Sequence, residues 1–169
     1  MNQNSGAMIL TIALIQCRHL LLGSKIGQGS QFVGMGKDLY DAYPAARQVV
    51  DEADDALGGT LKHVMFEGSQ EDLTRTENAQ PAILTTSIAM LRVLEMERGF
   101  KIEDSCRYAL GHSLGEYSAL VATKAVTLQD AVKLVVSLSL FFFLVTCSHI
   151  DLQECEPDKV ANIIHASCS

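Results

Sequence analysis

The pattern of apolar and polar positions predicts short strands and helices in alternation along the chain. Residues 7–17 form an uncharged apolar run, which is typical of a buried strand leading into a glycine-rich loop. Residues 107–110 form a second, shorter candidate strand. Behind it, residues 114–123 carry apolar and small side chains at helical spacing, which predicts a helix there.

The clearest amphipathic helix is predicted to begin at Pro44, because a missing N–H costs nothing in the first helical turn. Its apolar stripe consists of Ala46, Val49, Val50, Ala53, Ala56 and Leu57. Four acidic residues lie outside this stripe, namely Asp51, Glu52, Asp54 and Asp55. We interpret them as a solvated face rather than a metal site, and we expect the two glycines at 58–59 to end the helix.

Two more helices are predicted before the second strand. Ser69 stands at an N-cap position three residues before Asp72 and predicts a short helix. Residues 78–81 predict a loop, followed by a helix that continues to about Arg98 and ends at Gly99. The resulting order of strands, glycine loop and helices predicts an α/β fold.

One stretch carries candidate chemistry. Residues 111–116 read Gly-His-Ser-Leu-Gly-Glu and match the pattern Gly-x-Ser-x-Gly, in which a serine sits on a sharp turn between a strand and a helix. Ser113 is therefore a candidate nucleophile, and the unpaired N–H groups at the helix start are suited to hold an oxyanion. A glycine-rich turn with a helix-capping serine fits the same residues, so both interpretations stay open at this point.

A second unusual stretch precedes the first helix. Residues 27–36 read Gly-Gln-Gly-Ser-Gln-Phe-Val-Gly-Met-Gly and predict a loop in which backbone approaches another group closely. The residues match neither the phosphate-loop nor the dinucleotide-binding pattern. Gln28, between two glycines, is a suitable neutral hydrogen-bond donor for an oxygen atom.

Composition and charge narrow the class of protein. The chain has 169 residues, of which 48% are hydrophobic and 20% charged, as expected for one globular domain. The net charge of −7 argues against nucleic acid as a partner. The five cysteines form no Cys-x-x-Cys pair, which favours free thiols in a reducing compartment. Their spacing to His149 and His165 fits no zinc pattern, so we expect no metal site.

Two apolar runs raise the question of a membrane. Residues 7–17 have the length of a signal-peptide core, but no positive charge precedes them. Residues 134–147 lack charge and are short for a membrane span, so a core helix accounts for them equally well. We therefore do not expect membrane association.

Three motifs together resemble a known family. The stretches Gly-Gln-Gly-Ser-Gln at 27–31, Asn-Ala-Gln-Pro-Ala at 78–82 and Gly-His-Ser-Leu-Gly-Glu-Tyr-Ser-Ala-Leu-Val at 111–121 occur in the order and spacing of malonyl-CoA:acyl carrier protein transacylases. More broadly, they resemble the acyltransferase domains of fatty acid and polyketide synthases. The resemblance covers residues 27–135 as an acyltransferase-like region. It leaves an atypical apolar segment at 1–26 and an atypical tail at 136–169. A tail foreign to the family and a core helix both stay open as accounts of these residues.

The resemblance implies a role for each matching residue. Ser113 would be the nucleophile, and the backbone N–H groups of Leu114 and Gln28 would form the oxyanion hole. His112 and Gln80 would line the substrate pocket. The implied fold is the N-terminal part of an α/β-hydrolase-like acyltransferase subdomain.

The resemblance also implies a reaction and partners. Malonyl-CoA would acylate the serine, and the thiol of acyl carrier protein would then remove the malonyl group, as in fatty acid biosynthesis. Coenzyme A thioester is the substrate, and no metal or redox cofactor is implied. The implied location is the mitochondrion or the cytoplasm.

The sequence departs from the family in several places. Lys124 stands where the family usually has glycine, and Ile26 where it has proline. Leu138 stands at the spacing of the family's carboxylate-binding arginine, and the base histidine would lie beyond Ser169. We therefore expect a truncated member that lacks the small ferredoxin-like subdomain and transfers malonyl groups at or near background.

Two alternatives to an active S-malonyltransferase remain. A catalytically dead fragment or pseudo-enzyme of the same family explains the departures. A serine esterase of the α/β-hydrolase type explains the serine turn but leaves the loop at 27–36 without a role. For a chain of this length we also expect apolar faces near Leu110 and Val121 to lack partners.

Overall fold

The structure is a computed structural model, which describes residues 14–17, 20–22 and 29–148. Its strands are β1 Leu14–Cys17, β2 Leu20–Leu22 and β3 Cys106–Leu110. Its helices are α1 Lys37–Ala42, α2 Pro44–Ala56, α3 Leu61–Phe66, α4 Gln70–Thr74, α5 Thr76–Arg98, α6 Ile102–Ser105, α7 Leu114–Ala122 and α8 Leu128–Ser148. A strand segment before the helices and a second strand directly before the serine turn agree with the prediction, but six helices in a row separate β2 from β3, and the described part of the chain is mostly helical.

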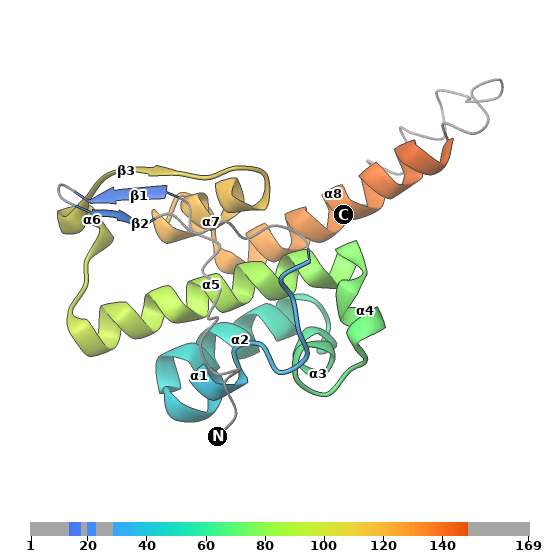
Figure 1. Cartoon of the computed structure of the whole chain (residues 1–169), viewed down its shortest axis with the longest axis horizontal. Coiled ribbons are helices and arrows are strands. Elements are labelled where there is room, and N and C mark those ends of the chain that lie inside the picture. Colours follow the sequence, from blue (N-terminus) through green and yellow to red (C-terminus); the bar gives the residue numbers. More distant parts are fainter. Residues whose placement is uncertain (1–13, 18–19, 23–28, 149–169) are drawn as a thin grey trace.

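The long helix α5 is the centre of the molecule (Figure 1). It packs against α2, α7 and α8, and α3 and α4 contact it as well. Residues 81–89 of this helix are all buried. Because neighbours surround the helix on several sides, its apolar residues do not form a single stripe, and even Thr85 and Thr86 lie in the interior.

The three strands form one small sheet at an end of α5, in the order β2-β1-β3. Both pairs are antiparallel, with Leu14 opposite Leu110 where β1 meets β3. The candidate strand at 107–110 is confirmed as β3, which leads into α7. β1 falls at the end of the predicted apolar run, whose residues 7–13 lie outside the described part of the chain.

Helix α2 confirms the predicted boundaries but corrects one interpretation. Ala46, Val49, Val50 and Ala53 are buried as expected. Asp54, however, is only 7% exposed, and its carboxylate accepts a hydrogen bond of 2.8 Å from the backbone N–H of Lys62 at the start of α3. The prediction of a uniformly solvated acidic face is therefore wrong for Asp54, because it satisfies an otherwise unpaired donor of the next helix.

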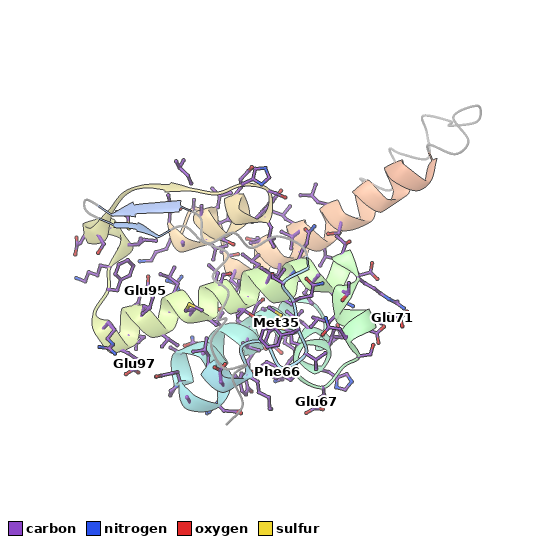
Figure 2. The ribbon with its side chains drawn as sticks, in the orientation of Figure 1. Met35, Phe66, Glu67, Glu71, Glu95 and Glu97 are labelled. Atoms are coloured by element: carbon purple, nitrogen blue, oxygen red, sulfur yellow. The ribbon has the colours of Figure 1, made fainter. Side chains whose placement is uncertain are left out.

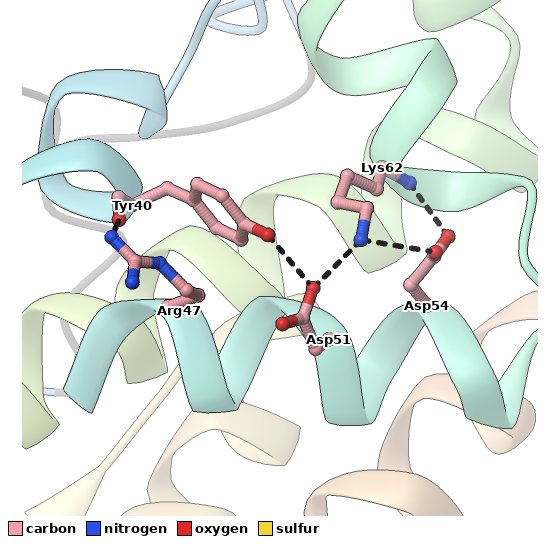
Figure 3. Close-up of polar contacts among 5 residues, drawn as sticks. All are labelled: Tyr40, Arg47, Asp51, Asp54 and Lys62. Atoms are coloured by element: carbon pink, nitrogen blue, oxygen red, sulfur yellow. Dashed lines mark hydrogen bonds and ion pairs between the residues drawn. The ribbon is translucent and has the colours of Figure 1, made fainter. Parts of the chain in front are cut away.

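Lys62 also links α2 to α3 through its side chain (Figure 3). Its Nζ lies 2.7 Å from a carboxylate oxygen of Asp51, which also accepts a hydrogen bond from the Tyr40 hydroxyl at 3.1 Å. The hydrogen bond to Asp51 raises the pKa of Lys62. This contact is largely exposed, so it orients the two helices rather than contributing much to stability.

The start of α5 differs from the prediction of a loop at 78–81. The helix already begins at Thr76, and Pro81 lies inside it, fully buried in the second turn. Because Pro81 lies beyond the first turn, its missing N–H removes the hydrogen bond that this position would otherwise make to the carbonyl of Glu77. The end of α5 is as predicted, with Gly99 in the left-handed conformation at φ 61°. Ser69 is likewise confirmed as the cap of α4, since its Oγ accepts the N–H of Asp72 at 3.0 Å.

Apolar and acidic side chains of the helical layer point in different directions (Figure 2). Met35, which is 7% exposed, points into the interior of the helical layer. Glu67 and Glu71 project outward at the edge formed by α3 and α4, and Glu97 projects at the far end of α5. These three carboxylates therefore lie on the outside of the helical layer, away from the core.

Helix α8 is a core helix in its first half. Leu128, Ala131, Val132 and Val135 are buried against the rest of the core, and the second half extends away from the other helices (Figure 1). In the part of the chain that the structure describes, no helix is both long and apolar enough to cross a membrane. The predicted boundary between residues 135 and 136 falls inside this continuous helix.

Candidate active site

The candidate nucleophile sits on a strained turn. Ser113 joins β3 to α7 with φ 54° and ψ −121°, a conformation that residues with a side chain rarely adopt. Holding a non-glycine residue there costs about 1–3 kcal/mol, and such strain clusters at functional sites. A strand, a sharp turn that exposes a serine, and a following helix are the structural context that the Gly-x-Ser-x-Gly pattern requires.

Sterics require glycine at position 111, just before the turn. A Cβ on Gly111 would overlap the backbone carbonyl of Gly115 and the backbone nitrogen of Glu116. The end of β3 therefore lies directly against the first turn of α7, and only glycine allows this approach.

The turn also presents backbone donors. Gly115 N–H donates to His112 O and Glu116 N–H donates to Ser113 O, each at 3.0 Å. Leu114 is the first residue of α7, so its N–H has no partner within the helix. His112 and Ser113 are both exposed, and Leu114 is half-buried. The structure thus brings these three predicted residues together in one turn.

The other predicted site residues lie elsewhere. Gln80 is half-buried in α5, a helix that packs against α7, but no hydrogen bond links it to Ser113 among the described residues. Gln28 lies outside the described part of the chain. The structure therefore leaves the pocket role of Gln80 and the donor role of Gln28 as predictions.

No base accompanies the serine within the described residues. Across residues 29–106 and 109–139, no histidine or carboxylate hydrogen-bonds to Ser113 Oγ. His63, the other described histidine, lies on α3 and pairs instead with Glu67 at 3.5 Å. It is a surface residue, as expected from its lack of a motif.

Two surface hollows lie away from this turn. One of about 440 Å³ is lined by Glu95, Phe100, Lys101, Glu103, Asp104 and Lys124. The other, of about 230 Å³, has a mixed lining that includes Val49, Ile88 and Arg92. Neither lining includes Ser113. Lys124 Nζ and a Glu103 oxygen are 2.8 Å apart, and this contact lowers the pKa of Glu103 and raises that of Lys124.

The glycine loop before α1 is held by residues that sequence reasoning missed. Gln31 is buried, and its side chain accepts the N–H of Gly29 at 2.8 Å. Gln70, which is 39 residues further along the chain, hydrogen-bonds to the backbone of the same loop. No spacing rule connects residues so far apart, so only the folded chain reveals them. Among the described residues, no group of three or more metal-ligating side chains is found.

Comparison with known proteins decides the family. A family model described as the acyl transferase domain matches residues 26–145. The chain belongs to the acyl transferase domain family. The match includes the serine turn, residues 78–82 and the glycine loop, which are the three motifs on which the resemblance rested.

The similar proteins of this family are malonyl CoA-acyl carrier protein transacylases. The Bacillus subtilis strain 168 enzyme is 55% identical over 106 residues, which cover 63% of this chain and 32% of the relative. A Drosophila melanogaster relative, named as a probable mitochondrial transacylase, is 44% identical over 109 residues, which make up 28% of the relative's length. The acyl-carrier-protein S-malonyltransferase of Bartonella henselae has 46% identity and a TM-score of 0.64, covering 67% of this chain and 36% of that one. This acyl transferase chain therefore spans about a third of the length of its relatives.

Proposed function

We propose that this acyl transferase chain carries the nucleophile region of a malonyl-CoA:acyl carrier protein S-malonyltransferase of fatty acid biosynthesis. The observation that carries the proposal is the strained backbone of Ser113, with φ 54° and ψ −121°, at a strand-to-helix turn. A helix-capping serine needs no such strain, and Ser113 makes no side-chain cap hydrogen bond to α7. The names of the similar enzymes support malonyl-CoA and acyl carrier protein as the two substrates.

Each predicted site residue has a role in the proposal. Ser113 is the nucleophile, and the N–H groups of Leu114 and Gln28 hold the oxyanion. The position of Leu114 at the first turn of α7 supports this role, since its N–H has no intrahelical partner and the positive end of the helix dipole lies there. His112 and Gln80 line the pocket. The described elements form part of a larger α/β-hydrolase-like subdomain.

The proposed reaction has two steps, in which the malonyl group moves first to the serine and then to a second thiol. Ser113 Oγ attacks the thioester carbonyl of malonyl-CoA, its proton leaves to a base, and coenzyme A departs as a thiol to leave a malonyl ester. The thiol of acyl carrier protein then attacks that ester, and the serine hydroxyl is restored. The chemistry needs no metal or redox cofactor, because it only exchanges an acyl group between sulfur and oxygen. The location we infer is the mitochondrion or the cytoplasm.

The test uses malonyl-CoA labelled in the malonyl group. Although we expect turnover at or near background, a single slow acylation still leaves label on the protein. The wild-type chain should therefore retain label through denaturation, and peptide mapping should place that label on Ser113. The Ser113→Ala variant, which keeps the fold, should retain none. Equal labelling of the two proteins would refute the nucleophile role.

A second candidate function is a non-catalytic member of the same family. One observation favours it: among the described residues, none hydrogen-bonds to Ser113 Oγ, so nothing described here activates the hydroxyl. Absence of label on a wild-type chain that melts cooperatively would support this candidate. Release of p-nitrophenol from short esters without malonyl transfer would instead favour a serine esterase.

A further inference from the structure

One side chain of α4 anchors the glycine loop in the way that a neighbouring strand would. Gln70 Nε2 donates to Gln31 O at 3.0 Å, and Val33 N–H donates to Gln70 Oε1 at 3.1 Å. The amide thus offers one donor and one acceptor to alternate residues of the loop, which is the pattern of strand pairing. A contact of 3.3 Å from Nε2 to Thr74 Oγ1, one turn along α4, helps to hold the amide in this orientation.

Gln31 passes this constraint on to Gly29. Its side chain is only 5% exposed, and its Oε1 accepts the N–H of Gly29 at 2.8 Å. Gly29 has φ 112°, so the chain bends sharply at this residue. Since Gln70 holds the carbonyl of Gln31 and the side chain of Gln31 holds Gly29, the direction of the backbone at Gly29 is set from α4.

The other end of the loop is fixed to α3 and α5. Gly34 N–H donates to Met65 O at 2.7 Å, and a Cβ on Gly36 would lie 3.3 Å from the side chain of Thr86 in α5. α5 also packs against α7, which begins directly after Ser113. The loop and the serine turn therefore share α5 as a common support, and a shift of the loop on α5 changes its distance from Ser113.

We propose that Gln70 and Gln31 are positioning residues that set the loop at 29–34 relative to Ser113 and so control how fast the serine is acylated. The inference rests on the proposed function, in which the backbone N–H of Gln28, the residue before Gly29, stabilises the oxyanion. Misplacing a donor by about 1 Å costs up to about 100-fold in rate. Losing the Gln70 contacts loosens the loop without removing a donor, so we expect a slowing of about tenfold.

The experiment measures the rate at which a fluorophosphonate labels Ser113 in the full 169-residue chain. This probe forms a tetrahedral, oxyanion-like adduct but carries neither malonyl nor coenzyme A, so its reaction reports the site whatever the natural acyl group is. Gln70→Ala and Gln31→Met should both react about tenfold more slowly than wild type. Amide hydrogen exchange at Val33 should be faster in Gln70→Ala, because the acceptor of that N–H is gone.

Two matched controls separate positioning from stability. Ser69→Ala removes the cap of α4 but leaves both Gln70 contacts to the loop, and Gln48→Ala changes an exposed residue of α2. Both should react at the wild-type rate. If Ser69→Ala slows labelling as much as Gln70→Ala, or if Gln70→Ala reacts at the wild-type rate, the positioning role is wrong.

The outcomes also separate this inference from the proposed function. A wild-type chain that takes the phosphonate but no malonyl group refutes the malonyl substrate and leaves the positioning test valid. A wild-type chain that takes no phosphonate overturns both, because Ser113 is then not a reactive nucleophile.

Discussion

At the scale of single residues, two residues that flank α7 have positive φ angles, which favour glycine. Ser113 has φ 54° before the helix, and Lys124 has φ 61° after it. At the helix end, Lys124 N–H donates to Val121 O at 3.0 Å and Ala125 N–H donates to Leu120 O at 2.9 Å, which is the hydrogen-bonding of a left-handed cap. The strain at Ser113 accompanies a candidate function. The positive φ at Lys124 makes this a position where glycine would be free of steric strain.

The position of Lys124 leads to a prediction on stability. Lys124→Gly should melt about 2 °C higher than Lys124→Ala, because only glycine adopts this conformation without a steric cost. Both variants lose the contact between Lys124 and Glu103, so their difference isolates the backbone effect. Thermal unfolding at neutral pH measures it. Equal melting temperatures would show that the left-handed conformation at this residue is not strained.

The serine turn could be predicted from sequence because its cause is local. The close approach of Gly111 to Gly115 and the bend at Ser113 involve residues at most four positions apart. Gln70 acts on a loop 37–39 residues away, and nothing near it in sequence indicates that role. The glycine loop can therefore be recognised by its motif, but the residues that hold it cannot.

At the scale of elements, the junction between α2 and α3 depends on one buried carboxylate. Asp54 Oδ1 accepts the N–H of Lys62 at 2.8 Å, and the backbone oxygen of Asp54 accepts the N–H of Gly59 at the same distance. The side chain thus satisfies a donor in the first turn of α3, whose own N-cap, Thr60, makes no side-chain cap hydrogen bond. The turn at 58–59 brings the two helices into this contact.

We predict that Asp54→Ala lowers the free energy of unfolding by about 1 kcal/mol, the usual cost of removing a side-chain cap. Asp54→Asn, which keeps an acceptor oxygen, should recover most of this loss. The matched control is Asp55→Ala at the neighbouring exposed position, where we expect almost no change. Urea unfolding of the three variants measures these differences. A loss for Asp55→Ala as large as for Asp54→Ala would mean that the two carboxylates act through net charge instead.

At the scale of the whole molecule, large apolar side chains remain on the surface of β3, α7 and α8. Leu110 on β3 is 60% exposed, Leu120 on α7 is 41% exposed and Leu134 on α8 is 46% exposed. α7 contacts both β3 and α8, so these residues belong to one connected part of the fold. The expectation of an uncovered apolar face is confirmed for Leu110 and wrong for Val121, which is 2% exposed. The helical phase turns Leu120 outward and its neighbour Val121 into the core.

These exposed leucines lead to a prediction about solution behaviour. The 169-residue chain should self-associate as its concentration rises, because uncovered apolar surface promotes association. Replacing Leu110, Leu120 and Leu134 together by glutamine should shift the chain toward monomer in sedimentation velocity. Replacing Leu94 and Met96, which are exposed near the far end of α5, is the matched control and should have a smaller effect. A wild-type chain that stays monomeric at all concentrations would refute the prediction.

The sequence by itself determined the features whose physical cause lies within a few residues. The stop at Gly99, the cap at Ser69 and the serine turn at 111–115 follow from steric limits and hydrogen-bonding of neighbouring residues, and all three are found in the structure. The three motifs also led to the correct family, because their order and spacing are specific even though each motif alone is common.

Only the tertiary structure decided which polar residues are interior and which segments lie against each other. Asp54 reads as part of a solvated acidic face, and Thr85 and Thr86 read as polar positions, yet all three are buried by packing from other helices. Gln70 reads as one of several surface residues of a short helix, yet it holds the glycine loop. Burial and pairing depend on which distant segments meet, and that contact is absent from any local stretch of sequence.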